Sequence, residues 1–183
     1  MAELDAAMGE LSSAPGIVFD LRHRPRAIVD GLLSHLLVEP DKGVWEHVPR
    51  IIRPDSSAHP AEWKYTGSLL PVLEPHIRGK VAFLIGSETL SYAESLVGLI
   101  AYYRLGALIG SVTAGVNGSV AQIATPSGCS VYFTAERITR LDGSRFHLLG
   151  FQPTIHVEPT VEGVAAGRDE VLERGLDYVR TGH

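Results

Sequence analysis

The stretch K-V-A-F-L-I-G-S-E-T-L-S-Y-A-E-S at residues 80–95, continued by L-V-G-L-I-A-Y-Y-R-L-G-A-L-I-G-S-V-T-A-G-V-N-G to residue 118, decides the fold. Residues 80–85, with an uninterrupted apolar run, predict a buried strand, and the periodic segment 91–103 predicts a helix. Residues 107–110 predict a second strand, which a glycine-rich loop follows. A strand, a helix and a strand in this order form a right-handed crossover between parallel strands. The sequence therefore predicts an α/β domain.

Ser91, at the start of the expected helix, fits two roles. S-Y-A-E has the spacing of a capping box, in which the Ser91 hydroxyl binds the helix end and Glu94 reaches back. The same position suits a nucleophile, because backbone N–H groups at a helix N-terminus can stabilise an oxyanion. The residues around Ser91 do not form a G-x-S-x-G elbow, so spacing alone favours the cap.

Seven segments in order resemble peptidase family S41, the C-terminal processing (tail-specific) serine proteases. They are G-I-V-F-D-L-R at 16–22, G-K-V-A-F-L at 79–84, T-L-S-Y-A-E-S at 89–95, I-G-S-V-T-A-G-V-N-G at 109–118, D-G-S at 142–144, G-F-Q-P-T-I-H-V at 150–157 and A-G-R-D-E-V-L-E-R at 166–174. The resemblance implies a crotonase-like ββα core, with a mixed sheet and flanking helices. It also implies that Ser91 is the nucleophile and that the backbone N–H of Tyr92 is an oxyanion donor.

The general base is missing from the positions that the resemblance implies. One branch of the family uses a lysine in a T-x-G-K-G loop, where this chain has Val116. The other branch uses a histidine before the D-L-R strand, and this chain begins only about one helix before that strand. We therefore expect a histidine from outside this part of the chain. His23, in the loop after the first strand, is a substitute base, and Glu136 is the candidate acidic partner.

The loop after D-L-R also departs from the family pattern. Active members carry a Gly-Gly pair there, whereas this chain has H-R-P-R-A at 23–27. A backbone N–H near Arg26 is the expected second oxyanion donor, although the loss of glycine and the presence of Pro25 restrict the backbone. Arg24 and Arg26 are also suited to holding a peptide carboxylate, with two solvated arginines as the simpler interpretation.

Composition limits the classes of protein. The 183 residues, 45% hydrophobic and 20% charged, are expected to form a single domain over 1–183. A net charge of −5 without a Lys/Arg cluster argues against nucleic acid as a partner. A membrane is not expected either, because no apolar run reaches about 20 residues and no signal peptide is apparent. We expect a cytoplasmic location for the chain as given. The single Cys129 excludes an internal disulfide.

Residues 39–75 are expected to be a Pro-rich insertion, because six prolines interrupt any long element. Trp45 and Trp63 make it too apolar for a tether, so it is expected to pack against the core or to cover a substrate cleft. Further strands are expected at 16–21, 131–134, 137–141 and 154–157, and helices at 2–11, 28–37 and 168–178.

Other polar residues have simpler interpretations. His35, His47, His59 and His76 lack the spacing of a metal site and are expected to be mostly solvated, so neither metal nor cofactor is expected. The family resemblance suggests a structural hydrogen bond for His147. Asp142 is expected to begin an Asp-Gly turn, Asp20 to anchor its loop, and Asp169 to lie at a helix start.

Two functions remain open. The first is a serine-type peptidase that cleaves peptide or protein substrates through Ser91. The alternative is a catalytically impaired peptide-binding or assembly module derived from an S41 protease. An acyl-CoA-handling crotonase is a more distant third, because a shared fold does not determine function. In either of the first two cases a homo-oligomer or an N-terminal partner segment is expected.

Overall fold

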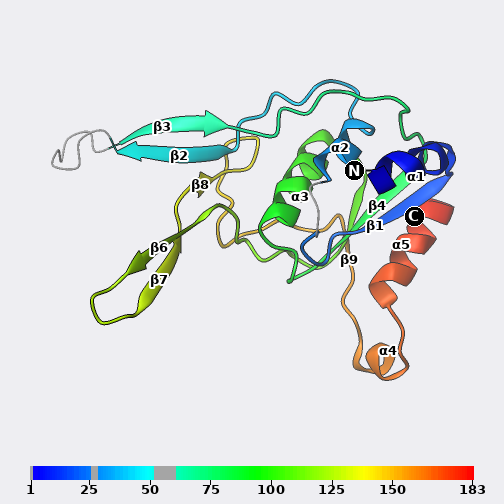
Figure 1. Ribbon diagram of the computed structural model, residues 1–183. Helices are drawn as coiled ribbons and strands as arrows, with labels where there is room; N and C mark the ends of the chain where they lie inside the picture. Colours follow the sequence, from blue (N-terminus) through cyan, green and yellow to red (C-terminus); the bar gives the residue numbers. More distant parts are fainter. Residues whose placement is uncertain (1, 26–28, 52–60) are drawn as a thin grey trace.

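The computed structural model describes residues 2–25, 29–51 and 61–183 of the chain (Figure 1). Its elements are α1 (Ala2–Ser13), β1 (Gly16–Asp20), α2 (Asp30–Ser34), β2 (Glu46–Ile51), β3 (Ala61–Thr66), β4 (Lys80–Ile85), α3 (Tyr92–Tyr103), β5 (Ala107–Gly110), β6 (Val120–Ala124), β7 (Ser130–Thr134), β8 (Arg137–Ile138), β9 (Ile155–His156), α4 (Val161–Ala165) and α5 (Glu170–Thr181).

A four-stranded sheet in the order β1-β4-β5-β9 forms the centre of the molecule, and every neighbouring pair in it is parallel. Phe83 in β4 lies opposite Phe19 of β1 on one side and Leu108 of β5 on the other. The predicted strand–helix–strand crossover is confirmed as β4–α3–β5. All four strands therefore end at the same edge of the sheet, where loops from distant parts of the sequence meet.

Both faces of this sheet are covered, which explains why β4 is apolar without interruption. Val81, Phe83 and Ile85 belong to a cluster with α3 and α2, whereas Ala82 and Leu84 belong to a second cluster with Val171 of α5. Gly175 of α5 lets this helix lie close to the sheet, since a Cβ atom there would come 2.9 Å from Leu84 Cδ2. The predicted α/β fold, with mixed strands and flanking helices, is thus confirmed.

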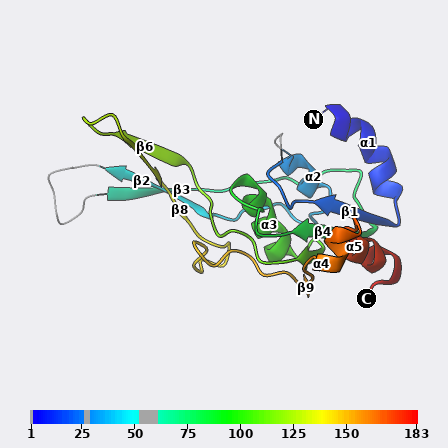
Figure 2. The same ribbon diagram turned by 90° about the horizontal axis from the view of Figure 1, so that it is seen from below.

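The insertion is more regular than its prolines indicated. Instead of an irregular segment, β2 and β3 pair antiparallel from Glu46–Thr66 to Ile51–Ala61, and β8 pairs with the start of β2. Pro49 is tolerated because it lies beyond the two residues of β2 that pair with β8. Figures 1 and 2 show this hairpin and the β6–β7 hairpin leaving the same side of the α/β body.

Several boundaries differ from the expected ones. The strand expected at 137–141 is only Arg137–Ile138, and the strand at 154–157 is only Ile155–His156. The helix expected at 28–37 is Asp30–Ser34 followed by a turn, while α5 runs to Thr181. Short, partly paired strands have little periodicity, so pattern alone places their ends poorly.

Candidate active site around Ser91

Ser91 lies between the carboxyl end of β4 and the start of α3, on a strained turn. Its backbone has φ 55° and ψ −125°, a conformation that residues other than glycine rarely adopt. Ser91 Oγ makes no hydrogen bond within the described part of the chain, including none to the end of α3. The Ser91 half of the predicted capping box is therefore wrong, because the left-handed turn directs the backbone away from cap geometry.

The turn is held by its neighbours. Thr89, which is fully buried, donates its hydroxyl to the carbonyl of Leu21 at 2.8 Å and accepts the N–H of Gly86 at 2.9 Å. The N–H of Ser91 donates to the carbonyl of Val116 at 2.7 Å. The loop after β4 is thus tied both to the loop after β1 and to the glycine-rich loop. These bonds offset the strain at Ser91.

Glu94 has a role that its sequence position did not reveal. Its carboxylate is buried and accepts bonds from the Thr113 hydroxyl (2.5 Å), the Gly115 N–H (2.7 Å) and the Val116 N–H (2.9 Å). Burial raises the pKa of Glu94 above its ordinary value, although these bonds oppose the rise. Glu94 therefore holds the glycine-rich loop against α3.

A signal for this role was present in the sequence. Glu94 lies on the same helix as Ala93, Leu96 and Val97, all of which are buried. A carboxylate among buried apolar positions needs several hydrogen-bond donors around it, since burying a charge without them is costly. The capping-box interpretation directed attention to the helix end instead.

Tyr92 is the first residue of α3, where the backbone N–H groups point out of the helix end. Its half-buried side chain accepts the N–H of Val29 through the hydroxyl oxygen at 2.8 Å. Tyr92 therefore connects the Ser91 turn to the segment before α2. That segment follows Arg26, the other predicted oxyanion residue, which lies outside the described residues.

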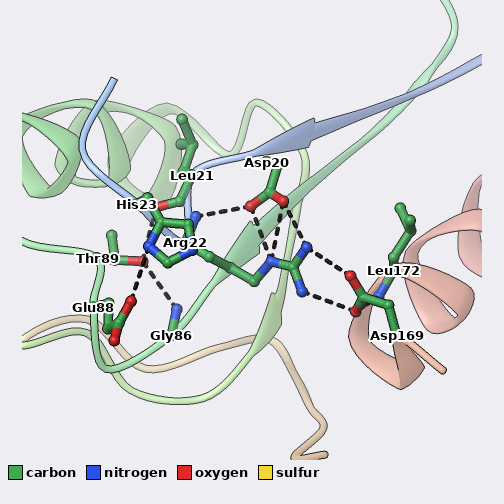
Figure 3. A network of polar contacts seen from close by, with 9 residues as sticks. All are labelled: Asp20, Leu21, Arg22, His23, Gly86, Glu88, Thr89, Asp169 and Leu172. Carbon is green, nitrogen blue, oxygen red and sulfur yellow. Dashed lines mark hydrogen bonds and ion pairs between the residues drawn. The ribbon is translucent and has the colours of Figure 1, made fainter. Parts of the chain in front are cut away.

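His23 is directed toward Glu88 (Figure 3). Its Nδ1 lies 2.9 Å from Glu88 Oε2, and both side chains are largely exposed. The two residues line an open cleft of about 310 Å³ at the carboxyl edge of the parallel sheet, together with Arg22, Ser87 and Ser111. His23 is thus brought to the edge of the sheet from which the Ser91 turn emerges, but its ring bonds Glu88 rather than Ser91.

Arg22 fastens this edge to α5, as Figure 3 shows. Its guanidinium bonds both carboxylate oxygens of Asp20 and both of Asp169, at 2.6–3.1 Å. The hydrogen bonds from Arg22 lower the pKa of Asp169. Asp169 also accepts the N–H of Leu172 as the N-cap of α5. The expected roles of Asp20 as a loop anchor and Asp169 as a helix-start residue are both confirmed.

Glu136 binds the loop beyond the glycine-rich segment. It accepts the N–H of Ser119 at 3.0 Å, and although burial opposes the change, the bonds from Ser119 lower the pKa of its carboxyl. Glu46 of β2 lies beside it, and the pKa of Glu46 is raised by burial and by Glu136. Glu136 therefore bridges Ser119 and the base of the β2–β3 hairpin.

The other described histidines have local partners. His147 accepts the N–H of Ile138 at 3.2 Å, so the predicted structural hydrogen bond is confirmed. His35, expected to be solvated, is instead buried with Nδ1 3.0 Å from the Pro75 carbonyl, and His47 lies 3.0 Å from the Thr139 hydroxyl. His59 is outside the described residues. In the part of the chain that the structure describes, no three His, Cys, Asp or Glu side chains gather as a metal site requires.

None of the described helices is both long and apolar enough to span a bilayer.

The model of peptidase family S41 matches residues 1–157, most of the chain. The chain belongs to peptidase family S41. No curated protein matches the sequence. The S41 assignment agrees with the strand–turn–helix that presents Ser91.

Solved structures resemble this S41 chain in fold. They include a candidate peptidase from Parabacteroides merdae ATCC 43184 (TM-score 0.76, 19% identity, 97% of this chain and 56% of the other). Mature CPAF complexed with lactacystin is also similar (0.71, 13%, 98% and 45%), as is the photosystem II D1 C-terminal processing protease (0.57, 19%, 90% and 42%). This chain therefore spans about half the length of these proteins, and at such identities the likeness shows the fold.

Proposed function

We propose that this chain carries the nucleophile of a serine peptidase acting on peptide or protein substrates. The observation that supports this most strongly is the left-handed backbone of Ser91 at a strand–turn–helix, with its hydroxyl unbonded within the described residues. Backbone strain of this kind persists where the surrounding structure enforces it, and it is concentrated at active sites. A residue that served only as a helix cap would gain nothing from the strain.

In the proposed reaction Ser91 Oγ attacks the carbonyl carbon of the scissile peptide bond, and its proton passes to a histidine. The backbone N–H of Tyr92 and one near Arg26 hold the oxyanion of the tetrahedral intermediate. The histidine then protonates the leaving amine, and water hydrolyses the acyl-enzyme ester. We assign the base to a histidine from a partner segment or another copy of the chain, because His23 contacts Glu88. Glu136, the candidate acidic partner of the base, binds Ser119.

The second candidate function is a peptide-binding or assembly module without catalysis. The specific observation in its favour is Val116, whose carbonyl bonds the N–H of Ser91 and whose own side chain is 52% exposed. Where the related bacterial proteases are expected to have a lysine, this side chain offers no base. Such a module would retain the cleft lined by His23 and Glu88 and bind without cutting.

Fluorophosphonate labelling distinguishes the two functions. The probe reacts with an activated serine, so we expect labelling of the tryptic peptide that contains Ser91 and its loss in Ser91→Ala. Ser87→Ala is the matched control, because Ser87 is exposed in the same loop. Peptide binding without labelling, measured by fluorescence anisotropy on the same protein, would favour the module.

A further inference from the structure

Trp45 lies at the base of the β2–β3 hairpin, where the insertion joins the body. The backbone N–H of Trp45 donates to the Thr66 carbonyl at 3.1 Å, and the backbone carbonyl of Trp45 accepts the Thr139 N–H at 2.9 Å. The ring packs against the main core. Among the described residues, Trp45 Nε1 is the buried side-chain nitrogen or oxygen that has no hydrogen-bond partner.

An unpaired buried N–H is unusual, because the group loses its hydrogen bond to water on folding and gains no other bond that offsets the cost. Trp45 lines a small cavity that is also lined by α3, the helix that follows Ser91. The volume that the centre of a water molecule can occupy in this cavity is about 20 Å³. A single water requires roughly 10–15 Å³ by this measure, so the cavity accommodates one water and little else.

The cavity also contains the polar partners that a buried water needs. Its lining includes Glu94, Ser95, Asn117 and Thr139, among apolar neighbours such as Leu99 and Phe146. The Glu94 carboxylate has about four acceptor sites, of which the bonds from Thr113, Gly115 and Val116 occupy three. Ser95 Oγ accepts from Asn117 Nδ2, which leaves its own hydroxyl hydrogen for another acceptor. A water here can therefore accept from Trp45 and donate to Glu94.

We propose that this cavity binds one ordered water that links the indole N–H of Trp45 to Glu94, making Trp45 a positioning residue for Ser91. Glu94 holds Gly115 and Val116, and the Val116 carbonyl bonds the Ser91 N–H. The water thereby connects the base of the insertion hairpin to the nucleophile turn. The positioning role rests on the proposed peptidase function, whereas the water site does not.

The water is tested by nuclear magnetic resonance on the unmodified chain labelled with ¹⁵N. The sequence has two tryptophans, and Trp63 is 41% exposed, so Trp63→Phe assigns the two indole signals. We expect the Trp45 indole proton to exchange slowly with solvent and to show a nuclear Overhauser effect to a long-lived water. A slowly exchanging Trp45 indole without a water signal would overturn the water site.

The link to Ser91 is tested with Trp45→Phe, which keeps an aromatic ring but removes the donor. We expect the backbone amide signal of Ser91 to shift and the rate of fluorophosphonate labelling to fall about three- to tenfold, as for the loss of one hydrogen bond. Peptide affinity, measured in a Ser91→Ala background, should stay unchanged, which a merely structural defect would not allow. Trp63→Phe is the matched control.

Each failure has a separate meaning. An unchanged Ser91 amide signal in Trp45→Phe would overturn the positioning role, even if the water is present. If no protein labels at all, the proposed peptidase function fails, while the indole and amide signals still decide the water site and its link to Ser91. If Trp45→Phe does not fold, the water signal in the unmodified chain decides the site, and the Ser91 amide shift is measured in Ser95→Ala, which removes another wall of the cavity.

Discussion

The backbone N–H of Ser91 donates a 2.7 Å hydrogen bond to the carbonyl oxygen of Val116. This bond joins the turn after β4 to the glycine-rich loop after β5, two segments that the parallel sheet brings to one edge. Glu94 strengthens the junction by binding the N–H of Val116 from inside the helix. The position of Ser91 is therefore fixed by two segments that are separate in the sequence.

Replacing Ser91 by glycine should stabilise the fold while removing the proposed nucleophile. Ser91 has φ 55°, and strain of this kind costs the folded state about 1–3 kcal/mol. Glycine relieves the strain, but it is also more flexible in the unfolded chain, which cancels part of the gain in stability. We expect the free energy of unfolding in urea to rise by about 1 kcal/mol. Ser87→Gly should bring no gain, because Ser87 does not have a positive φ. An unfolding midpoint below that of wild type for Ser91→Gly would refute the strain.

Glu94→Gln should loosen the glycine-rich loop. A glutamine oxygen can replace one carboxylate oxygen, but its NH₂ group would then face the Val116 N–H, placing one donor against another. We expect the free energy of unfolding to fall by about 1–3 kcal/mol. We also expect Ser91 to lose its fluorophosphonate labelling.

The matched control for Glu94→Gln is Glu88→Gln. The Glu88 side chain is 72% exposed, and its carboxylate lies 2.9 Å from His23 Nδ1. Such pairs contribute little, so we expect a change within about 0.5 kcal/mol. Equal effects of the two substitutions on the thermal midpoint would contradict the role of Glu94.

Val116→Lys should supply a base within the chain. Val116 bonds Ser91 through its carbonyl, and its side chain is 52% exposed, so a lysine there keeps access to water. A general base contributes about 10²- to 10⁴-fold when well placed. For an unrefined position we expect Ser91 labelling to accelerate about tenfold, and more at high pH, where lysine loses its proton. Val112→Lys, in the same loop and 39% exposed, should leave the rate unchanged. Equal rates in the two variants would rule out Val116 as a base position.

Arg22→Lys should weaken the joint between β1 and α5, because an ammonium group cannot bond two carboxylates in the forked manner of a guanidinium. We expect a loss of at most about 1 kcal/mol at pH 7, since these groups are partly exposed. Arg24→Lys is the control, because Arg24 is exposed. No difference between the two variants in urea unfolding would contradict the joint.

The same joint predicts a dependence on pH. Arg22 lowers the pKa of Asp169 from its ordinary value of 3.8, so the carboxylate is ionised more readily in the folded state. The contribution of the ionised Asp169 to stability is complete above pH 3.8, and it is lost as the pH falls through the lower pKa that Asp169 has in the folded state. The stability difference between wild type and Arg22→Lys should therefore shrink in acid. A difference that stays constant down to pH 2 would count against this assignment.

Local pattern predicted the elements that have strong periodicity. The apolar run of β4 and the repeat of α3 correspond to structure because both are buried in the main core. The β2–β3 hairpin was missed because its prolines suggested irregular chain, and because β2 also pairs with β8, which lies about 90 residues further along the sequence. Long-range pairing leaves no mark within a short window of sequence.

The sequence by itself determined the α/β order of the elements, the S41 family and the place of Ser91 at the start of a helix, because apolar periodicity and segment order are local properties. Only the tertiary structure decided what Ser91 and Glu94 do there. The left-handed backbone of Ser91, the inward carboxylate of Glu94 and the pairing of His23 with Glu88 depend on which loops meet at the sheet edge. Such meetings are set by packing of the whole chain, which stabilises a strained turn that local preference alone would avoid.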